Sequence, residues 1–194
     1  RPERNLTGLT YFSPELAAKR LELLKDALPK IRRCSVLTNP DNPVNKPTLD
    51  AMGQAAAKLG LKLQTLEARS ADRLPDAFSA MSTSRSEGLI LIEDGVLIAA
   101  AAQLAQLAAK SRIPVIGFTE IADAGGFMAY GVDIPAMFRR AAHYVDRLHK
   151  GAKPADLPIE RATKFDLIVN MKAAKALGIT VPASLLVRAN RVIE

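Results

Sequence analysis

The chain is poor in the residues that usually build metal sites and covalent crosslinks. Its 194 residues include one cysteine, two histidines and no tryptophan. A single cysteine, Cys34, excludes an intramolecular disulfide and a metal site made of several cysteines. His143 and His149 would be turned by about 240° from one another on a helix, so they cannot share a face. We therefore expect no metal site, and we predict that Cys34 is a small residue of the core.

Long apolar runs are also missing. A transmembrane helix needs about 20 predominantly apolar residues, whereas the longest apolar region, residues 96–109, is interrupted by Gln103 and Gln106. No signal-peptide pattern is present within these residues either. Because the chain begins at Arg1 rather than at a methionine, we expect it to be a piece of a longer protein. The missing signal then leaves the location of that protein open.

Charge is not concentrated in any one stretch. The formal net charge is +7, from 27 Lys and Arg against 20 Asp and Glu, which permits binding to an acidic partner. The basic residues are interleaved with acidic ones, without a basic block, a zinc-finger spacing or an aromatic RNA-binding signature. The composition therefore does not favour a nucleic-acid-binding protein.

What is present is an alternation of short apolar segments with amphipathic helical patterns. Such alternation is typical of βαβ units on a parallel sheet, with the loops at the carboxyl ends of the strands gathered along one edge. The sequence thus predicts an α/β fold with a Rossmann-like parallel sheet. The expected strands are 34–38, 61–66, 88–92, 114–117, 127–130 and 165–169, and the expected helices are 13–28, 46–59, 72–83, 96–110, 134–148, 171–177 and 182–186.

An asparagine-rich loop follows the strand 34–38. It contains two Asn-Pro pairs, and proline disfavours the α conformation in the residue before it, so each pair forces extended or turn backbone. Asn39, Asn42 and Asn45 carry neutral amides that both donate and accept hydrogen bonds. Two interpretations are open: these amides contact a ligand at the carboxyl edge of the sheet, or they only form turns and cap a helix.

Three further loops are expected at the same edge: Glu93-Asp94-Gly95, Phe118–Glu120 and Tyr130-Gly131. Neighbouring residues of a strand point to opposite faces, so Glu93 and Asp94 are a poor acid–base pair. Either carboxylate can face a cleft, or Asp94 only turns the chain and caps the next helix; Glu120 allows the same two readings. Phe118 and Tyr130 either flank the apolar part of a ligand or belong to the edge of the core.

No catalytic set accompanies these loops. The chain lacks a glycine-rich phosphate-binding pattern after its first long strand, and it lacks a Ser-His-Asp arrangement and the glycines of a nucleophile elbow. We therefore predict that the chain binds a small polar molecule rather than transforming it, without enzyme activity and without a cofactor.

Several stretches form a pattern that extends over essentially the whole chain. They are Asn5-Leu-Thr-Gly-Leu-Thr10, residues 15–28, Asn39-Pro-Asp-Asn-Pro43, Ala124-Gly-Gly-Phe-Met-Ala-Tyr-Gly131, Arg139-Arg-Ala-Ala142, Gly151-Ala-Lys-Pro-Ala-Asp-Leu-Pro158, Thr163-Lys-Phe165 and Asn170-Met-Lys-Ala-Ala-Lys-Ala-Leu-Gly178. In these stretches the chain resembles the substrate-binding proteins of an ABC transporter family, the group related to tryptophan-binding lipoproteins. The run at 151–158 is fairly specific to that group.

The resemblance implies a periplasmic-binding-protein fold of type I, in which two lobes joined by three crossing strands clamp a ligand. Residues 1–12 would then be a hinge segment, and residues 13–130 the second, carboxyl-terminal ligand-binding lobe. Residues 131–194 would return to the first lobe, with the third crossing strand at 165–170 followed by terminal helices. Most of the first lobe, with its signal peptide, is expected to be missing from this chain.

The resemblance also indicates which residues face the cleft, and Tyr130 joins them as a residue at a strand end. The expected ligand-binding residues are Asn39, Asn42, Asn45, Asp94, Phe118, Thr119, Glu120 and Tyr130, and the expected hinge residues are Thr7, Gly8, Gly131 and Asn170. Related amino-acid binders often carry a serine-rich, acidic loop where this chain has Asn-Pro-Asp-Asn-Pro. Tryptophan is therefore not assumed as the ligand.

We interpret the chain as the solute-binding component of an ABC importer, periplasmic or anchored outside the cytoplasm. It would bind an amino acid or a small organic acid and deliver it to a membrane permease. The alternative is a small-molecule-sensing regulatory domain or an α/β enzyme on the same fold. If the first lobe is missing, the helix at 134–148 exposes the apolar residues Phe138, Val145 and Leu148, which predicts a dimer or a larger species.

Overall fold

The computed structural model describes residues 5–11 and 13–194. By the contacts between its residues, the chain divides into two compact units. Unit 1 comprises residues 1–12 and 132–165, and unit 2 comprises residues 13–131 and 166–194. The chain therefore passes from one unit to the other three times.

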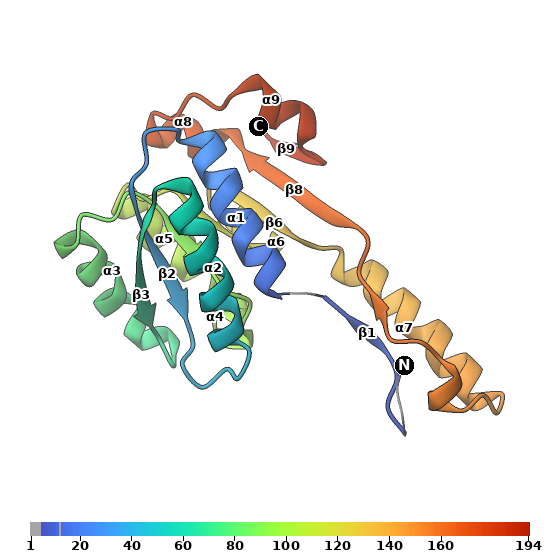
Figure 1. The fold of residues 1–194 in the computed structure, drawn as a ribbon. Helices are drawn as coiled ribbons and strands as arrows, with labels where there is room; N and C mark the ends of the chain where they lie inside the picture. Colours follow the sequence, from blue (N-terminus) through green and yellow to red (C-terminus); the bar gives the residue numbers. More distant parts are fainter. Residues whose placement is uncertain (1–4, 12) are drawn as a thin grey trace. The chain divides into compact units, whose positions relative to one another are not determined.

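Unit 2 is built on a seven-stranded sheet with the strand order β3-β2-β4-β5-β6-β8-β9 (Figure 1). Strand β2 pairs in parallel with β3 and β4, β4 with β5, β5 with β6, and β8 with β9. The strands are β2 (Arg33–Thr38), β3 (Lys62–Glu67), β4 (Leu89–Leu91), β5 (Val115–Gly117), β6 (Met128–Val132), β8 (Phe165–Asn170) and β9 (Arg191–Ile193). The predicted α/β fold with a parallel sheet is confirmed.

The helices of unit 2 lie close to their predicted positions. They are α1 (Ser13–Ala27), α2 (Asn45–Leu59), the 3₁₀ helix η1 (Ala71–Arg73), α3 (Leu74–Thr83), α4 (Gly95–Ala99), α5 (Ala101–Lys110), α6 (Thr119–Asp123), α8 (Met171–Leu177) and α9 (Ala183–Arg188). The single helix predicted over 96–110 is wrong, because the backbone of Ala100 leaves the helical conformation and separates α4 from α5. In the part of the chain that the structure describes, no helix is long and apolar enough to cross a membrane.

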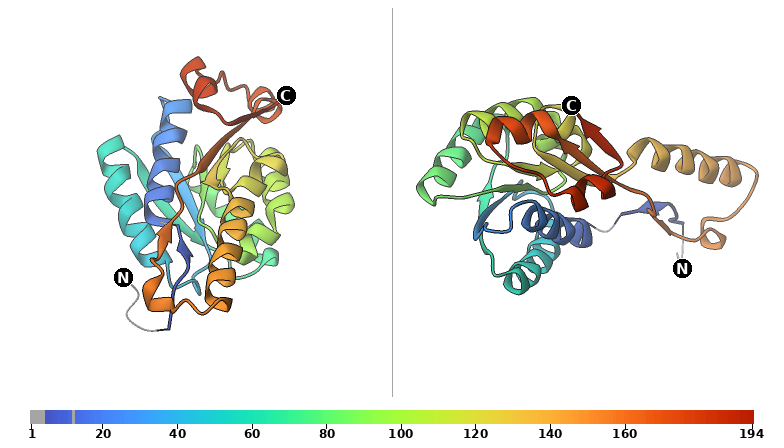
Figure 2. Two further views of the ribbon diagram at one scale, coloured as in Figure 1. Left: turned by 90° about the vertical axis from the view of Figure 1, so that its right-hand side faces the viewer. Right: turned by 90° about the horizontal axis from the view of Figure 1, so that it is seen from above.

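Alternating strand residues fill two hydrophobic cores, one on each face of the sheet. In β4, Leu89 and Leu91 belong to the core that includes residues of α3, α4, α5 and α6, whereas Ile90 belongs to the core that includes residues of α1, α2, α8 and α9. Helices α1 and α2 lie side by side on one face, with α3 and α5 on the other (Figure 2). This three-layer packing fixes the strands, and with them the loops that follow the strands.

Cys34 is 2% exposed in the core beneath α1 and α2, which confirms its predicted place. Burial, reinforced by the carboxylate of Glu87, raises the pKa of the Cys34 thiol to about 12. The thiolate is the reactive form, and such a pKa reduces its population roughly a thousandfold.

We therefore expect native Cys34 to react with an aromatic disulfide reagent at least roughly a hundredfold more slowly than Cys34 in urea-unfolded protein, because burial removes both the thiolate and its access. Stopped-flow absorbance measures both rates at one pH. A native rate within a few-fold of the unfolded rate would refute the buried position.

Unit 1 combines a two-stranded parallel sheet with one long helix. Its elements are β1 (Leu9–Thr10), α7 (Ile134–His149), the 3₁₀ helix η2 (Pro154–Asp156) and β7 (Glu160–Arg161). Arg140 of α7 donates from Nε (2.7 Å) and Nη2 (2.5 Å) to the carboxylate of Glu160, and these bonds lower the pKa of Glu160 to about 2. The Tyr144 hydroxyl donates to the carbonyl of Pro158 (2.6 Å). Both contacts tie α7 to the segment that contains β7.

The predicted return segment 131–194 is divided differently by the structure. Only residues 132–165 cluster with the amino-terminal residues, whereas 166–194 belong to unit 2. The reason is that β8 joins the main sheet, where the backbone N of Asn170 donates to the carbonyl of Phe127 (3.0 Å). Val169 and Leu185 complete the core beneath α1 and α2. The terminal helices therefore pack on unit 2, and the hinge role of residues 1–12 stays a prediction.

Candidate functional site

The predicted ligand residues lie at or just beyond the carboxyl ends of β2, β4, β5 and β6. Asn39, Asn42, Asp94 and Phe118 lie in connecting segments, whereas Asn45 begins α2, Thr119 and Glu120 begin α6, and Tyr130 lies within β6. These strands are neighbours paired in parallel, so the loops after them begin at the same carboxyl edge of the sheet. Leu89 lies opposite Val115, and Ile90 opposite Ile116. Asp94 and Glu120 therefore follow adjacent strands at corresponding positions. The structure places the three predicted loops after β2, β4 and β5 at one edge of the sheet, where open α/β sheets bind ligands. The predicted loop at Tyr130-Gly131 is wrong, because β6 continues through both residues to Val132.

Asp94 organises the first two of these loops. Its Oδ1 accepts hydrogen bonds from Asn39 Nδ2 (3.2 Å) and from the backbone N of Val96 (2.9 Å), and its Oδ2 accepts one from Asn42 Nδ2 (3.1 Å). Asn42 Nδ2 also donates to the carbonyl of Glu93 (3.2 Å). The capping role of Asp94 at α4 is thus confirmed. A ligand contact by Asp94 or Asn42 stays a prediction.

The other two asparagines are turned into the loop. Asn39 and Asn45 are 9% and 8% exposed. Asn45 Nδ2 donates to the carbonyl oxygen of Asn39, which also accepts from the backbone N of Asn42 (3.0 Å). Asn39 Oδ1 accepts from the backbone N of Asp41 (3.1 Å). These bonds favour the turn-forming interpretation for Asn39 and Asn45. Half-buried Asn42 also forms a turn, because its Oδ1 accepts from the backbone N of Val44 (3.1 Å).

Two carboxylates at this edge, Asp94 and Glu120, stand apart from the ion pairs of the described residues. Within the described residues, neither Asp94 nor Glu120 forms an ion pair, and both side chains are half-buried. Glu120 accepts a hydrogen bond from the Thr119 hydroxyl (3.1 Å). The edge therefore favours a ligand group that is positively charged or donates hydrogen bonds. Across residues 5–11 and 13–194, no group of three His, Cys, Asp or Glu could hold a metal ion.

The adjacent carboxylate, Glu93, is neutralised by an arginine that the sequence analysis missed. Arg20 of α1 is fully buried. Its guanidinium pairs with Glu93 through Nη1 (2.9 Å) and Nη2, and donates to the carbonyls of Leu91 (2.9 Å) and Tyr130 (2.8 Å). The signal in the sequence is the place of Arg20 on the apolar stripe of α1, because a charge on such a stripe requires a buried partner.

The two aromatic candidates have different environments. Phe118 is 3% exposed and lies in the core beneath α3 and α5, so its side chain is covered by the core and the prediction that it flanks a ligand is not supported. Tyr130 is half-buried beside the other core. Ligand contact stays a prediction for Tyr130 and for Thr119.

The predicted hinge residues differ in how close they lie to the boundaries between the two units. Gly131 is the last residue of unit 2 before the crossing at 131–132, and Thr7 and Gly8 lie in unit 1 just before β1. Asn170 is 4% exposed inside unit 2, where its Oδ1 caps α8 by accepting from the backbone N of Ala173 (3.0 Å). The third unit boundary falls at 165–166, so Asn170 is a helix cap rather than a boundary residue. Hinge roles for the other three stay predictions.

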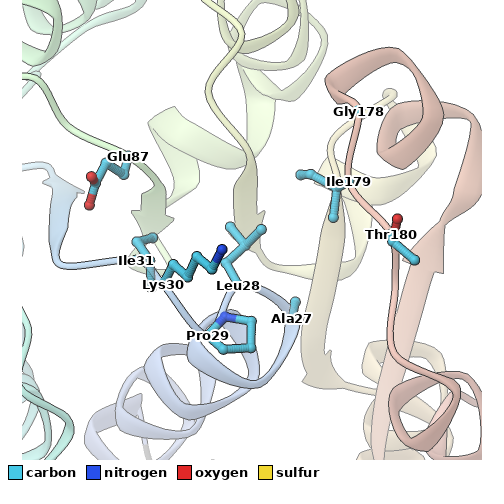
Figure 3. Close-up of a pocket in the computed structure, with 9 residues that line it drawn as sticks. All are labelled: Ala27, Leu28, Pro29, Lys30, Ile31, Glu87, Gly178, Ile179 and Thr180. Carbon is cyan, nitrogen blue, oxygen red and sulfur yellow. The ribbon is translucent and has the colours of Figure 1, made fainter.

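A pocket of about 620 Å³ lies at the opposite edge of the sheet. Figure 3 shows its walls, which come from the end of α1 and the turn before β2, from Glu87 before β4, and from the segment after α8. Leu28, Ile31 and Ile179 make much of its surface apolar. It contains none of the predicted ligand residues, and the binding site at the carboxyl edge stays a prediction.

The chain is similar to substrate-binding proteins in sequence and in structure. Residues 1–193 match the family described as ABC transporter substrate binding protein. A tyrosine-binding protein of Clostridioides difficile (strain R20291) is 22% identical over 179 residues. Among solved structures, a conserved domain protein from Vibrio cholerae has a TM-score of 0.89 at 28% identity. The ABC domain from Streptococcus pneumonia in complex with L-Trp has a TM-score of 0.88 at 25% identity.

These relatives are longer than the chain. The match covers 91% of this chain but 51% of the tyrosine-binding protein. It covers 97% of this chain but 63% and 65% of the two solved chains. Since the family match extends over nearly every residue, the chain belongs to the ABC transporter substrate-binding protein family.

Proposed function

We propose that this chain is the ligand-binding part of a solute receptor of an ABC importer. The receptor binds an α-amino acid in an interlobe cleft, at the carboxyl edge of the unit 2 sheet, and delivers it to a membrane permease. It works outside the cytoplasm, in the periplasm or anchored to the membrane. Family membership supports this proposal, as do relatives whose names state binding of tyrosine or a complex with L-Trp.

The observation that carries the choice of ligand is that Asp94 and Glu120 form no ion pair with any residue that the structure describes, and that Asp94 accepts hydrogen bonds from neutral groups, the amides of Asn39 and Asn42 and the backbone N of Val96. An α-amino acid brings an ammonium group, which forms charge-assisted hydrogen bonds with carboxylates. A small organic acid brings only negative charge, which these two side chains repel. The edge therefore favours an amino acid over a small organic acid.

The remaining contacts are proposed to come from the part of the relatives that this chain does not span. Ligand binding between two lobes favours the closed form of a hinged pair, and the permease would recognise that form. With one face of the clamp only, we expect this chain alone to bind its ligand weakly.

The role of the ammonium group can be tested by calorimetry on a version of the chain extended to the length of its relatives. L-tyrosine and L-tryptophan are compared with their analogues that lack the amino group. We expect the analogues to bind at least about tenfold more weakly, because each loses a charge-assisted hydrogen bond. Equal affinity of L-tyrosine and its des-amino analogue would refute ammonium recognition.

Association of the chain is also part of the proposal. Phe138 and Val145, two turns apart on α7, are 73% and 66% exposed, and an apolar patch of this kind promotes self-association. We expect a dimer or larger species by light scattering, and a shift towards monomer in Phe138→Glu. His143→Glu introduces the same charge on the opposite face of α7, and we expect it to leave the association state unchanged. A wild-type chain that stays monomeric at high concentration would contradict the expectation.

A further inference from the structure

The buried Arg20 is bonded to two segments that are far apart in the sequence, the end of β4 and the end of β6. Nη1 donates to the carbonyl of Leu91 and to Glu93, Nη2 donates to Glu93, and Nε donates to the carbonyl of Tyr130. The Arg20 side chain is 0% exposed and the Glu93 side chain 11%. A guanidinium is a planar fork with fixed donor directions, so it can hold these acceptors in one arrangement only.

Each partner adjoins a residue of the candidate site. Glu93 precedes Asp94, and its carbonyl accepts from the Asn42 amide. Tyr130 precedes Gly131, where the chain leaves unit 2. A Cβ added to Gly131 would lie 3.7 Å from Nη2 of Arg20 and 3.7 Å from Cγ2 of Thr119. Arg20, Thr119 at the start of α6, and Gly131 are therefore close neighbours within unit 2.

We propose that Arg20 is a positioning residue of the binding site, which holds the Asp94 loop and the crossing at 131–132 in one arrangement. A buried ion pair adds little stability over apolar residues of similar volume, whereas removing one partner is costly. In some proteins such a pair is retained because it specifies one arrangement, and the proposal assigns this role to Arg20. The inference rests on the proposed function, because it assigns Arg20 a role in ligand binding. A ligand that displaces the Asp94 loop would then also move the Arg20 side chain, which is bonded to Glu93 in that loop and to the Tyr130 carbonyl next to the crossing.

Replacement of Arg20 by lysine distinguishes the ion pair with Glu93 from the hydrogen bond to the Tyr130 carbonyl. A lysine keeps the positive charge and can pair with Glu93, but its single ammonium group cannot reproduce the Nε bond to the Tyr130 carbonyl. We expect hydrogen exchange of Arg20→Lys to stay near the wild-type rate over 92–97 and to become at least about tenfold faster over 129–132. Arg20→Met should speed exchange in both segments.

Lys19→Met is the matched control. Lys19 is the neighbouring residue on α1, and it forms an ion pair with Glu22 in which both side chains are partly exposed (40% and 46%). We expect this variant to leave exchange unchanged in both segments, since exposed pairs contribute little. If Arg20→Met does not fold, Glu93→Gln replaces it, because it removes the charge of the partner while keeping its size.

Ligand affinity supplies the second readout, with L-tyrosine as the probe on a version extended to the length of the relatives. Arg20→Lys is expected to bind at least about tenfold more weakly than wild type, and Lys19→Met to bind normally. Equal acceleration of exchange across the whole sheet, or unchanged affinity in Arg20→Lys, would overturn the positioning role. If the wild type binds no amino acid, the proposed function fails, and the segment-specific exchange pattern still decides whether Arg20 holds both segments.

Discussion

Replacement of Asp94 by asparagine is expected to weaken amino-acid binding by about 10- to 100-fold, which is the effect of losing a charge-assisted hydrogen bond. The asparagine has the same shape, and its oxygen can still accept from the backbone N of Val96 (2.9 Å). Its NH₂ group, however, would face the Asn42 amide, which now donates to Oδ2 (3.1 Å). We expect a loss of about 1 kcal/mol in unfolding free energy from this clash of donors, too little to unfold the chain.

The control for Asp94→Asn is Asp41→Asn in the preceding loop. The Asp41 side chain is 66% exposed and pairs with Arg69, which is equally exposed, so its charge is screened by solvent. Calorimetric titration with L-tyrosine, on the version extended to the relatives' length, measures both variants. Equal affinity in Asp94→Asn and Asp41→Asn would show that the Asp94 charge is not recognised.

The largest stability loss is expected for Gly126→Ala, which tests the packing of the segment between α6 and β6 against α6 and β5. A Cβ at this position would lie 2.8 Å from both the carbonyl oxygen and Cγ1 of Ile121, and 3.0 Å from Cγ1 of Val115. The carbonyl cannot rotate away, because it accepts the hydrogen bond from the backbone N of Gly126 (2.7 Å). We expect a loss of about 1–3 kcal/mol or more in unfolding free energy, measured by urea denaturation.

A second glycine, Gly53, provides a control in which alanine is expected to raise the unfolding free energy rather than lower it. Gly53 lies within α2, and a Cβ there would meet no atom within 4 Å. Gly53→Ala should therefore raise the unfolding free energy by roughly 0.5–1 kcal/mol, because alanine loses less conformational entropy in a helix. If Gly126→Ala were as stable as Gly53→Ala, the close approach of Gly126 to Ile121 of α6 would be wrong.

Hydrophobic periodicity was sufficient to predict the layers of unit 2. The alternation in 61–66, the continuous apolar run at 88–92 and helical stripes such as that of α1 indicate directly which side chains are buried. The loops of the site were also predictable, because parallel strands place their carboxyl ends at one edge. The strands β7 and β9 were missed, since they are short, largely exposed segments whose formation depends on pairing with a distant strand.

The partners of polar side chains were less predictable than the positions of the loops. Arg20 lies four residues from Leu16 and from Leu24, on one buried stripe of α1, yet the sequence does not reveal that Glu93 would meet it. Phe118 was expected at the edge, but β5 continues in extended backbone into this residue and turns it into the core. Such contacts are long-range, and they depend on the arrangement of several elements at once.

The central claim is that the chain supplies one face of an amino-acid clamp. Thermal denaturation with a panel of amino acids and small carboxylates tests it most directly, on this chain and on a version extended to the length of its relatives. We predict that an amino acid raises the melting temperature of the longer version by several degrees and leaves the shorter chain almost unchanged, since a ligand stabilises only the state that binds it. Equal stabilisation of both versions, or stabilisation by carboxylates without an amino group, would contradict the account.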